Sequence, residues 1–416
     1  MLSIPTKTLQ ADPLPNLIPS SVALVVGDLS KSGAGRWGGA VRPFLLAQAL
    51  QKLGCRVKLV GFTFGDQAAI SSTADLEVIT APGKPYPQFW QSIRQLWPHL
   101  DGDLIYAYKP KPTSFGVALW HHLLKGKRPL LLDIDDWELS WHGGDAYRYQ
   151  PSLKQLVRDI AKSDGALRQP DHPLYLRWME KLVSRANAVT VHTQFLQQRF
   201  GGISIPNGKD TTLFNPENYN PTALKQRYGL AAYRVLMFPG APRPYKGVED
   251  ILLALDSLNE PDLRLVIVGG SPYDDYDQQL MQRWGRWIIK LPPMPHTQMP
   301  AAIAASDVLV VPQRDTPAAQ AQFPLKLTDG MAMAKPVLAT RVGDIPTILA
   351  DTGYLVEPES PNQLAAGIQA IFTNPEAAAA KGRQARARCI QHYSIDAMAV
   401  QMAEVLAQVY GNQMRN

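Results

Sequence analysis

The chain has 416 residues, of which 45% are hydrophobic and 19% are charged, which excludes a globally disordered chain and makes two domains the expectation. Its net charge of +6 is far from that of a dedicated DNA-binding protein, so we expect no nucleic-acid partner; the small excess suits anionic ligands or an anionic membrane surface. The two cysteines, Cys55 and Cys389, lie too far apart for a disulfide framework or for the usual zinc spacings, which is typical of a cytoplasmic protein.

The start of the chain predicts a flexible lead over residues 1–20. It is broken by prolines and has no apolar stretch long enough for the core of a signal peptide. No window of the sequence reaches the ~18 apolar residues of a membrane span. We therefore expect a cytoplasmic protein that is soluble or bound peripherally to the inner face of a membrane.

The first half of the chain reads as alternating strands and helices. An apolar run at 22–27 is followed by a glycine-rich loop, a helix closed by Gly54 and a second strand at 56–62, which is a unit of about the βαβ size. Further strand-like runs lie at 76–80, 103–108, 129–135 and 187–193. This alternation predicts a doubly wound parallel sheet.

A second series of the same kind begins near residue 232, with strands at 233–240 and 263–270 around a helix at 248–258. The sequence thus predicts an α/β protein with an acceptor domain over 21–210 and a second Rossmann-like domain over 211–390. The join is expected where proline, asparagine and glycine gather at 206–222. We expect residues 391–416 to form a helix that crosses back to the first domain.

One stretch, residues 137–178, interrupts the rhythm and is rich in aromatic and basic side chains. Such a segment suits a membrane interface or the grip of a sugar acceptor. The alternative is a helical excursion packed on the N-terminal domain.

Three segments have the residue types of a ligand site. The glycine loop with Gly33, Gly35, Gly38 and Gly39 lets backbone approach a ligand, although an ordinary turn explains it equally well. Arg243 and Lys246 stand between a strand and a helix N-terminus, as in a pyrophosphate cradle; the alternative is a solvated basic turn.

The third segment is the string QFPLKLTDGMAMAKPVLAT, from Gln322 to Thr340. It predicts a helix of small residues that packs closely beneath a ligand. Asp329, one turn inside this helix, is placed to accept hydrogen bonds from vicinal hydroxyls. The alternative is an ordinary helix with an exposed carboxylate.

Several motifs, in this order, resemble the GT-B glycosyltransferases of family 4 from about Val22 to Ala407. They are the glycine loop, IPNGKDTTLFNP, FPGAPRPYKGVEDILLAL, LRLVIVGG, MPAAIAASDVLVVPQ and FPLKLTDGMAMAKPVLAT. The resemblance implies the GT-B fold, two Rossmann-like domains facing across a cleft, with the nucleotide-sugar donor held mainly by the second. It also implies transfer with retention of anomeric configuration and without a metal. A weaker resemblance links the C-terminal motif to bacterial-type digalactosyldiacylglycerol synthases.

The resemblance assigns roles to individual residues. Gly35 would lie by the diphosphate and the transferred sugar, and Lys246 matches the diphosphate lysine of the family. Asp329 falls at the second acidic position of the family's Glu-x7-Glu motif, which binds ribose hydroxyls. The backbone amides around Phe323 to Leu325, a segment that includes Pro324, would meet the sugar and phosphate.

Three positions depart from the family pattern. The first glutamate of the acidic motif is Ala321, and the family's arginine falls at Ala241, so Arg243 takes the phosphate role from a different place. Where the family often has a histidine near the reacting carbon, this chain has Asp135 and Asp136. A carboxylate there suits a base or a partner for oxocarbenium charge, and the alternative is a helix cap and its neighbour.

The sequence therefore predicts a retaining hexosyltransferase with a nucleoside diphosphate sugar as donor, most simply a UDP sugar, and a hydroxyl acceptor. A membrane glycolipid or lipid-linked glycan fits the basic aromatic stretch, and a polysaccharide precursor is the other acceptor class. We expect no cofactor, since the nucleotide sugar is a substrate, and no metal, because His192 and His296 have no partners at ligand spacing. The alternative function is a nucleotide-sugar-binding partner subunit that has lost turnover.

Overall fold

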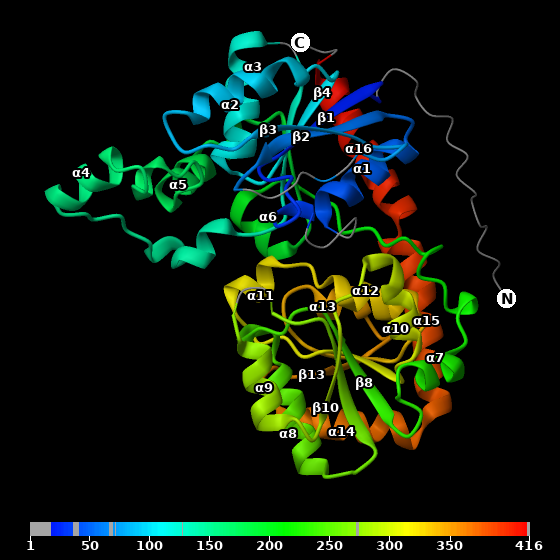
Figure 1. Ribbon diagram of the computed structural model, residues 1–416. Coiled ribbons are helices and arrows are strands. Elements are labelled where there is room, and N and C mark those ends of the chain that lie inside the picture. Colours follow the sequence, from blue (N-terminus) through cyan, green and yellow to red (C-terminus); the bar gives the residue numbers. More distant parts are fainter. Residues whose placement is uncertain are drawn as a thin grey trace.

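The computed structural model describes residues 18–35, 41–65, 70, 72–126, 128–271 and 274–413. Most of the expected lead, together with Gly38 and Gly39, lies outside these ranges. The described chain forms two α/β domains, one above the other in Figure 1. The predicted fold class, two Rossmann-like domains of the GT-B type, is confirmed.

Within the described residues, the N-terminal domain is built on a seven-stranded sheet in the order β3-β2-β1-β4-β5-β6-β7, with every neighbouring pair parallel. Its central strands are aliphatic runs buried on both faces, as a parallel sheet covered by helices requires. The strands are β1 Ser21–Val26, β2 Arg56–Thr63, β3 Glu77–Pro82, β4 Leu104–Tyr108, β5 Leu130–Ile134, β6 Ala188–Val191 and β7 Ile203–Ser204. The helices are α1 Arg42–Lys52, α2 Phe89–Leu96, α3 Val117–Lys125, α4 Leu153–Ala161, α5 Pro173–Lys181 and α6 Gln194–Phe200.

The described part of the C-terminal domain has a six-stranded parallel sheet in the order β10-β9-β8-β11-β12-β13. The strands are β8 Arg234–Pro239, β9 Leu263–Val268, β10 Ile288–Leu291, β11 Val308–Val311, β12 Val337–Thr340 and β13 Tyr354–Val356. The helices are α7 Pro221–Arg227, α8 Val248–Leu258, α9 Tyr276–Trp284, α10 Met299–Ala304, α11 Pro317–Ala321, α12 Leu325–Ala332, α13 Ile345–Leu349, α14 Pro361–Thr373 and α15 Pro375–Tyr393.

The last helix, α16 (Ile395–Gln413), follows the C-terminal domain in sequence but packs against α1 of the N-terminal domain. The turn between α15 and α16 falls at Ser394, which forms an isolated β-bridge with Lys209 of the segment that joins the domains. Two segments of the chain, one at Lys209 and one at Ser394, therefore cross between the domains side by side.

Residues 137–178 lie between β5 and β6 and contain α4 and most of α5. These helices project from the side of the N-terminal domain (Figure 1). The predicted interruption of the strand and helix rhythm is thus a helical excursion that is only partly packed on the domain.

Candidate active site

Both sheets reverse their winding next to their first strand. β1 lies between β2 and β4, and β8 lies between β9 and β11. In open α/β sheets, ligands bind beyond the carboxyl ends of the strands at such a reversal. The carboxyl edges also meet across the domains: the Gln194 backbone N–H, after β6, donates to Asp344 Oδ2 of the C-terminal domain at 2.9 Å. The candidate site is therefore the space between these two edges.

The turn after β8 holds Arg243 and Lys246 at this edge. Lys246 Nζ donates to the Ala241 carbonyl at 2.9 Å, and burial, followed by the nearby Arg243 charge, lowers the pKa of Lys246 to about 8. A buried ammonium whose charged form is disfavoured is stabilised when an anion arrives. The structure thus brings the two predicted cations together in one turn.

Neighbouring residues fix that turn in place. Gly247 has a φ of +65°, and a Cβ there would lie 1.7 Å from the Pro312 carbonyl oxygen, so only glycine lets the turn approach the end of β11 so closely. Arg314 donates two hydrogen bonds to Asp250 of α8, at 3.0 and 2.6 Å, and its amide bonds to the Tyr245 carbonyl. The cations are therefore held by packing between β11 and α8.

Lys326, at the start of α12, is a third cation that the sequence analysis missed. Its Nζ lies 3.9 Å from the centre of the Phe238 ring, at the end of β8. Burial, and then the charge of Lys246, lower its pKa well below the usual range. No ion pair of Lys246 or Lys326 is formed within the described chain. Two desolvated lysines in one place indicate a site for an anion.

The segment before α12 lies where the resemblance placed it, at the carboxyl edge. Phe323 is buried with its ring centre 6.0 Å from that of His192 of the other domain. Pro324 precedes the first helical residue, Leu325, whose side chain packs against hydrophobic clusters of both domains. The first turn of α12 presents backbone N–H groups without helical partners, which favour a phosphate.

Ala321 replaces the first glutamate of the acidic motif, and its surroundings are filled. It is fully buried and packs in the hydrophobic cluster of the N-terminal domain. Its carbonyl oxygen lies 3.2 Å from His192 Nε2, and burial is the largest cause that lowers the pKa of His192 to about 4. His192 is thus a neutral residue that joins the domains.

Asp329, the predicted ribose ligand, forms a buried ion pair with Lys209 of the segment that joins the domains. Lys209 is anchored in turn, because its amide donates to the Tyr393 carbonyl at 2.6 Å. The carboxylate of Asp329 therefore already has a charged partner, and a ribose hydroxyl would have to share it. Its ribose contact remains a prediction.

The two candidate carboxylates after β5 differ in their partners. Asp135 accepts a hydrogen bond from Tyr108 Oη, and its Oδ1 lies 3.4 Å from Lys109 Nζ. Asp136 accepts from Trp141 Nε1 at 3.0 Å, while its Oδ1 is buried without a hydrogen-bond partner in the described structure. Lys109 also pairs with Glu138.

The surroundings of Asp136 shift its pKa. Burial is the main cause that raises the pKa of Asp136 to about 6, and the charges of Glu138 and Asp135 add to it. Asp135 is instead held by its lysine and tyrosine. Oδ1 of each carboxylate is buried without a hydrogen bond in the described structure, but that of Asp135 faces Lys109. A carboxylate with a pKa near 6 has the properties of a general base, so Asp136 is the better catalytic candidate of the two.

An aromatic pair connects this carboxylate to the cation turn. Trp141, which bonds Asp136, has its ring centre 6.0 Å from that of Tyr245, the residue next to Lys246. The structure therefore brings the predicted catalytic pair and the predicted phosphate cations to the two sides of this contact between the domains.

Gly35 lies in the loop after β1, also at the carboxyl edge of its sheet. Its amide donates to the Ser30 carbonyl at 3.0 Å, and a Cβ at Gly35 would lie 2.7 Å from Ile70 Cγ1. The packing of the loop itself accounts for a glycine at this position. Its contact with a donor remains a prediction.

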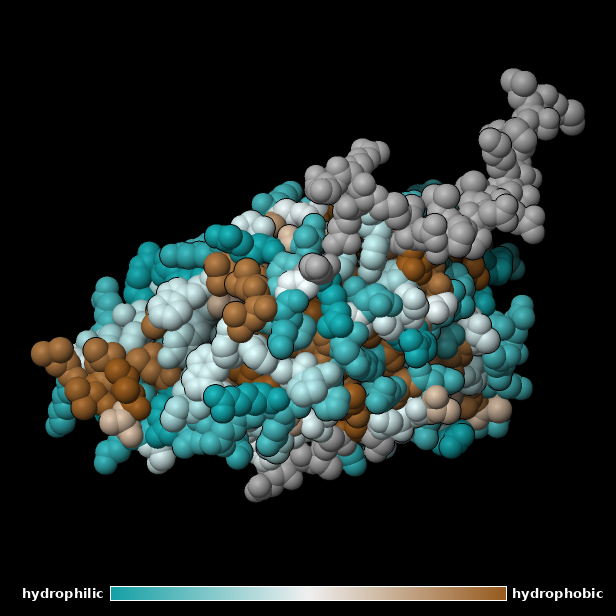
Figure 2. Space-filling view, turned by 90° about the horizontal axis from the view of Figure 1, so that it is seen from above, coloured by the Kyte–Doolittle hydropathy of each residue, from teal (hydrophilic) through white to brown (hydrophobic). Residues whose placement is uncertain are grey.

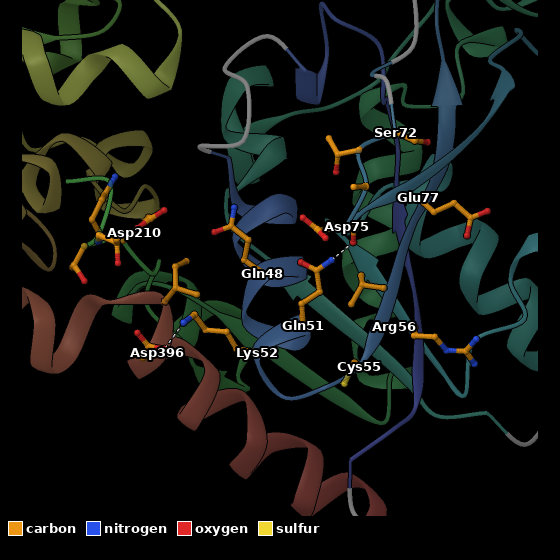
Figure 3. Close-up of a pocket in the computed structure, with 17 residues that line it drawn as sticks. Gln48, Gln51, Lys52, Cys55, Arg56, Ser72, Asp75, Glu77, Asp210 and Asp396 are labelled. Carbon is orange, nitrogen blue, oxygen red and sulfur yellow. Dashed lines mark hydrogen bonds and ion pairs between the residues drawn. The ribbon is translucent and has the colours of Figure 1, made fainter. Parts of the chain in front are cut away.

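A hollow of about 920 Å³ lies elsewhere, at the amino ends of β2 and β3, marked by Arg56 and Glu77 (Figure 3). In Figure 3, α1 and α16 meet at its rim through an ion pair of 2.6 Å between Lys52 and Asp396. Because it lies at the opposite ends of these strands, we do not assign it to the candidate active site. Among the described residues, no three His, Cys, Asp or Glu side chains are grouped to hold a metal ion.

Two Rossmann-like domains with facing carboxyl edges define the GT-B class of proteins. Solved structures agree with this arrangement: HepE of Anabaena, solved in complex with UDP-glucose, aligns with a TM-score of 0.70 at 20% identity over 93% of this chain and 99% of its own. Sucrose-phosphate synthase of Thermosynechococcus elongatus aligns with a TM-score of 0.67 at 20% identity over 94% and 100%.

Sequence comparisons give the family. Residues 233–374 match the family described as glycosyl transferases group 1. D-inositol 3-phosphate glycosyltransferase of Corynebacterium glutamicum is 27% identical over 95% of this chain and 96% of its own length. GDP-mannose-dependent alpha-(1-6)-phosphatidylinositol monomannoside mannosyltransferase of Mycolicibacterium smegmatis is 26% identical over 67% and 78%. The C-terminal domain thus resembles the glycosyl transferases of group 1, and the fold of the whole chain is that of the GT-B class.

Proposed function

We propose that the protein is a retaining, metal-independent glycosyltransferase of family 4, which moves a hexosyl group from a nucleoside diphosphate sugar to a hydroxyl acceptor. The observation that carries the proposal is the group of cations Arg243, Lys246 and Lys326 at the carboxyl end of β8, opposite Asp136. Two of these cations have lowered pKa values and no carboxylate partner within the described chain, so they suit a diphosphate that a ligand brings.

In this proposal the cations and the first turn of α12 stabilise the negative charge that develops on the leaving diphosphate. Electrostatic stabilisation of this kind is usually the largest contribution to catalysis. The bond between the anomeric carbon and the phosphate oxygen breaks, and a bond to the acceptor oxygen forms on the same face. Asp136 either takes the proton of the acceptor hydroxyl, or it faces the positive charge on the sugar ring while the leaving diphosphate takes that proton.

We propose a UDP sugar as donor and a membrane glycolipid or lipid-linked glycan as acceptor, which would place the protein peripherally on a cytoplasmic membrane face. Similarity to the structure solved with UDP-glucose supports the donor, and similarity to the phosphatidylinositol mannoside enzyme, whose own donor is GDP-mannose, supports the acceptor alone. No helix in the described ranges is long and apolar enough to cross a bilayer.

The test is release of nucleotide from UDP, GDP and ADP hexoses by the purified protein. We expect one donor class to release its nucleoside diphosphate, and Lys246→Met to lose this activity. Tight donor binding without any release, by hydrolysis or by transfer, would instead support a partner subunit that has lost turnover.

A further inference from the structure

Exposed hydrophobic side chains gather on one region of the N-terminal domain. We call it the α2–α5 surface, formed by helices α2, α3, α4 and α5. Eight of the twelve large hydrophobic residues that are exposed in the described structure lie on these four helices. They are Trp90, Trp120, Leu123, Leu124, Leu153, Val157, Ile160 and Trp178.

The most exposed of them form a stripe along α4. Leu153, Val157 and Ile160 are 84%, 65% and 58% exposed, and their spacing places them on one side of the helix. Another side of α4 contacts the protein through a polar residue: Asp159 is buried and accepts a hydrogen bond from Tyr149 Oη at 2.7 Å. Figure 2 shows hydrophobic atoms at the projecting end of the molecule, where Figure 1 places α4. The apolar stripe thus faces away from the domain.

A continuous row of aromatic rings joins the other helices of this surface. Trp120 of α3 contacts Trp90 of α2 with ring centres 5.1 Å apart, and Trp90 contacts Tyr86 at 5.5 Å. Tyr86 contacts Tyr175 of α5 at 6.0 Å, and Tyr175 contacts Trp178 at 5.6 Å. Tryptophan and tyrosine are enriched at membrane interfaces, where the apolar part of the side chain lies in lipid and the polar part in water.

The charge of the four helices is of one sign. Their sequences contain six Lys and Arg residues but only Asp159 and Glu180 as acids. Asp159 is buried, and Glu180 pairs with Arg199 and accepts from Trp137 Nε1. On α4, the exposed Lys154 and Arg158 lie beside the apolar stripe, and Arg158 also pairs at 2.9 Å with the exposed Asp164 that follows the helix. The exposed charge on the four helices themselves is therefore almost entirely positive.

We propose that the α2–α5 surface docks on a lipid bilayer that contains anionic lipids, with the apolar stripe of α4 inserted among the headgroups. The combination of exposed aliphatic side chains, a row of aromatic rings and flanking cations fits an anionic interface. A protein partner or a second copy of the chain is the other possible occupant, and the experiment below tests for both. The inference stands apart from the transfer chemistry.

Docking by this surface would also orient the active site. The excursion that contains α4 begins directly after Asp136, and Trp137 at its start bonds Glu180 of α5. The bilayer would thus contact the segment that continues directly from Asp136. A lipid-linked hydroxyl could then approach without leaving the membrane.

The experiment is flotation of the full-length protein with vesicles of phosphatidylcholine alone, or of equal parts phosphatidylcholine and phosphatidylglycerol. We expect flotation with the anionic vesicles that weakens at high salt. The variant Leu153→Ser/Val157→Ser/Ile160→Ser should bind at least about tenfold more weakly, since each side chain loses its burial in lipid. Lys154→Gln/Arg158→Gln should lower the anionic preference, by about fivefold for each charge.

A matched control removes three exposed apolar side chains elsewhere, as Leu253→Ser/Ile390→Ser/Val400→Ser. The control should float like the wild type. Both triple variants, the one on α4 and the control, should keep the thermal midpoint and the nucleotide release of the wild type. Equal flotation of the two triple variants would overturn the proposal. So would a wild type that self-associates through α4, or needs an added protein, without binding vesicles. Vesicle binding without nucleotide release would contradict the proposed function and leave this inference standing.

Discussion

At Lys246, burial lowers the pKa of the side chain, whereas the proposed binding of a diphosphate requires its charged form. Burial disfavours its charge, and a bound diphosphate would restore it, so the two effects are linked through the pKa of about 8. Below pH 8 the amine is already protonated, and binding takes up no proton. Above pH 8 the free protein has lost the proton and must regain it on binding.

We therefore expect the titration of Lys246 to raise the Kd for a UDP sugar by up to about tenfold per pH unit above pH 8. Titration calorimetry in two buffers of different ionisation enthalpy should show proton uptake at the higher pH. Lys246→Met should bind weakly and lose this pH dependence, whereas Arg286→Met, an exposed control, should behave as wild type. An unchanged pH profile in Lys246→Met would contradict the assignment.

Asp136 is predicted to carry the acid limb of the reaction. Because burial raises its pKa to about 6, the carboxylate becomes protonated as pH falls through 6, and kcat should decrease there. Asp136→Asn should lower kcat by about 100-fold or more with donor affinity retained. Asp135→Asn, which removes a carboxylate engaged by Lys109, serves as the comparison. Full activity in both variants would exclude the pair from catalysis.

At the scale of elements, one buried ion pair stabilises the carboxyl edge of the N-terminal sheet, near the end of β5. Arg42, at the start of α1, donates two hydrogen bonds to Asp133 of β5, at 2.9 and 2.7 Å, and others to the Ile205 carbonyl and to Asn207 Oδ1. Both charged side chains are fully buried. The pair thus joins a helix, a strand and the start of the crossing segment.

Breaking this pair should be costly, because it leaves one charge buried alone. We expect Arg42→Met to lower the free energy of unfolding by about 3–5 kcal/mol. The double variant Arg42→Met/Asp133→Leu should recover much of this loss. Guanidinium denaturation measures both, with Arg286→Met as an exposed ion-pair control worth at most about 1 kcal/mol. A loss in Arg42→Met no larger than in the control would refute this account.

For the whole molecule, the N-terminal domain is not one continuous stretch of sequence, because α16 belongs to it in space. α16 follows the C-terminal domain in sequence, yet Met402, Val405 and Leu406 are fully buried in the core of the N-terminal domain. The N-terminal domain therefore depends on a helix that lies beyond the C-terminal domain in sequence, and the two segments that cross between the domains couple them.

Two substitutions on this helix separate the two faces. Leu406→Ala should lower the free energy of unfolding by about 2–5 kcal/mol, since it opens a cavity in the core. Val400→Ala lies on the same helix but is 60% exposed, so it should change stability by no more than about 0.5 kcal/mol. Equal effects in denaturant unfolding would show that α16 does not complete this core.

The two sheets could be predicted from the sequence because most of their strands are short aliphatic runs, a pattern that is recognisable locally. The cation turn was predictable for the same reason, since Arg243 and Lys246 are neighbours. Lys326 was missed because a lysine in an apolar string reads as helix surface, and its burial depends on Phe238 in another strand. The pairing of Asp329 with Lys209 joins residues 120 positions apart, which no local pattern reveals.

The central claim, that the edges of the two domains form a site for glycosyl transfer, is tested most directly by the mass of an acceptor. The purified protein is incubated with UDP, GDP and ADP hexoses and a panel of lipid, lipid-linked and soluble hydroxyl acceptors. We predict an acceptor that gains the mass of one hexose from one donor class, with the product lost in Lys246→Met and Asp136→Asn. Equal product in wild type and both variants, or release of nucleotide with no acceptor ever gaining mass, would contradict it.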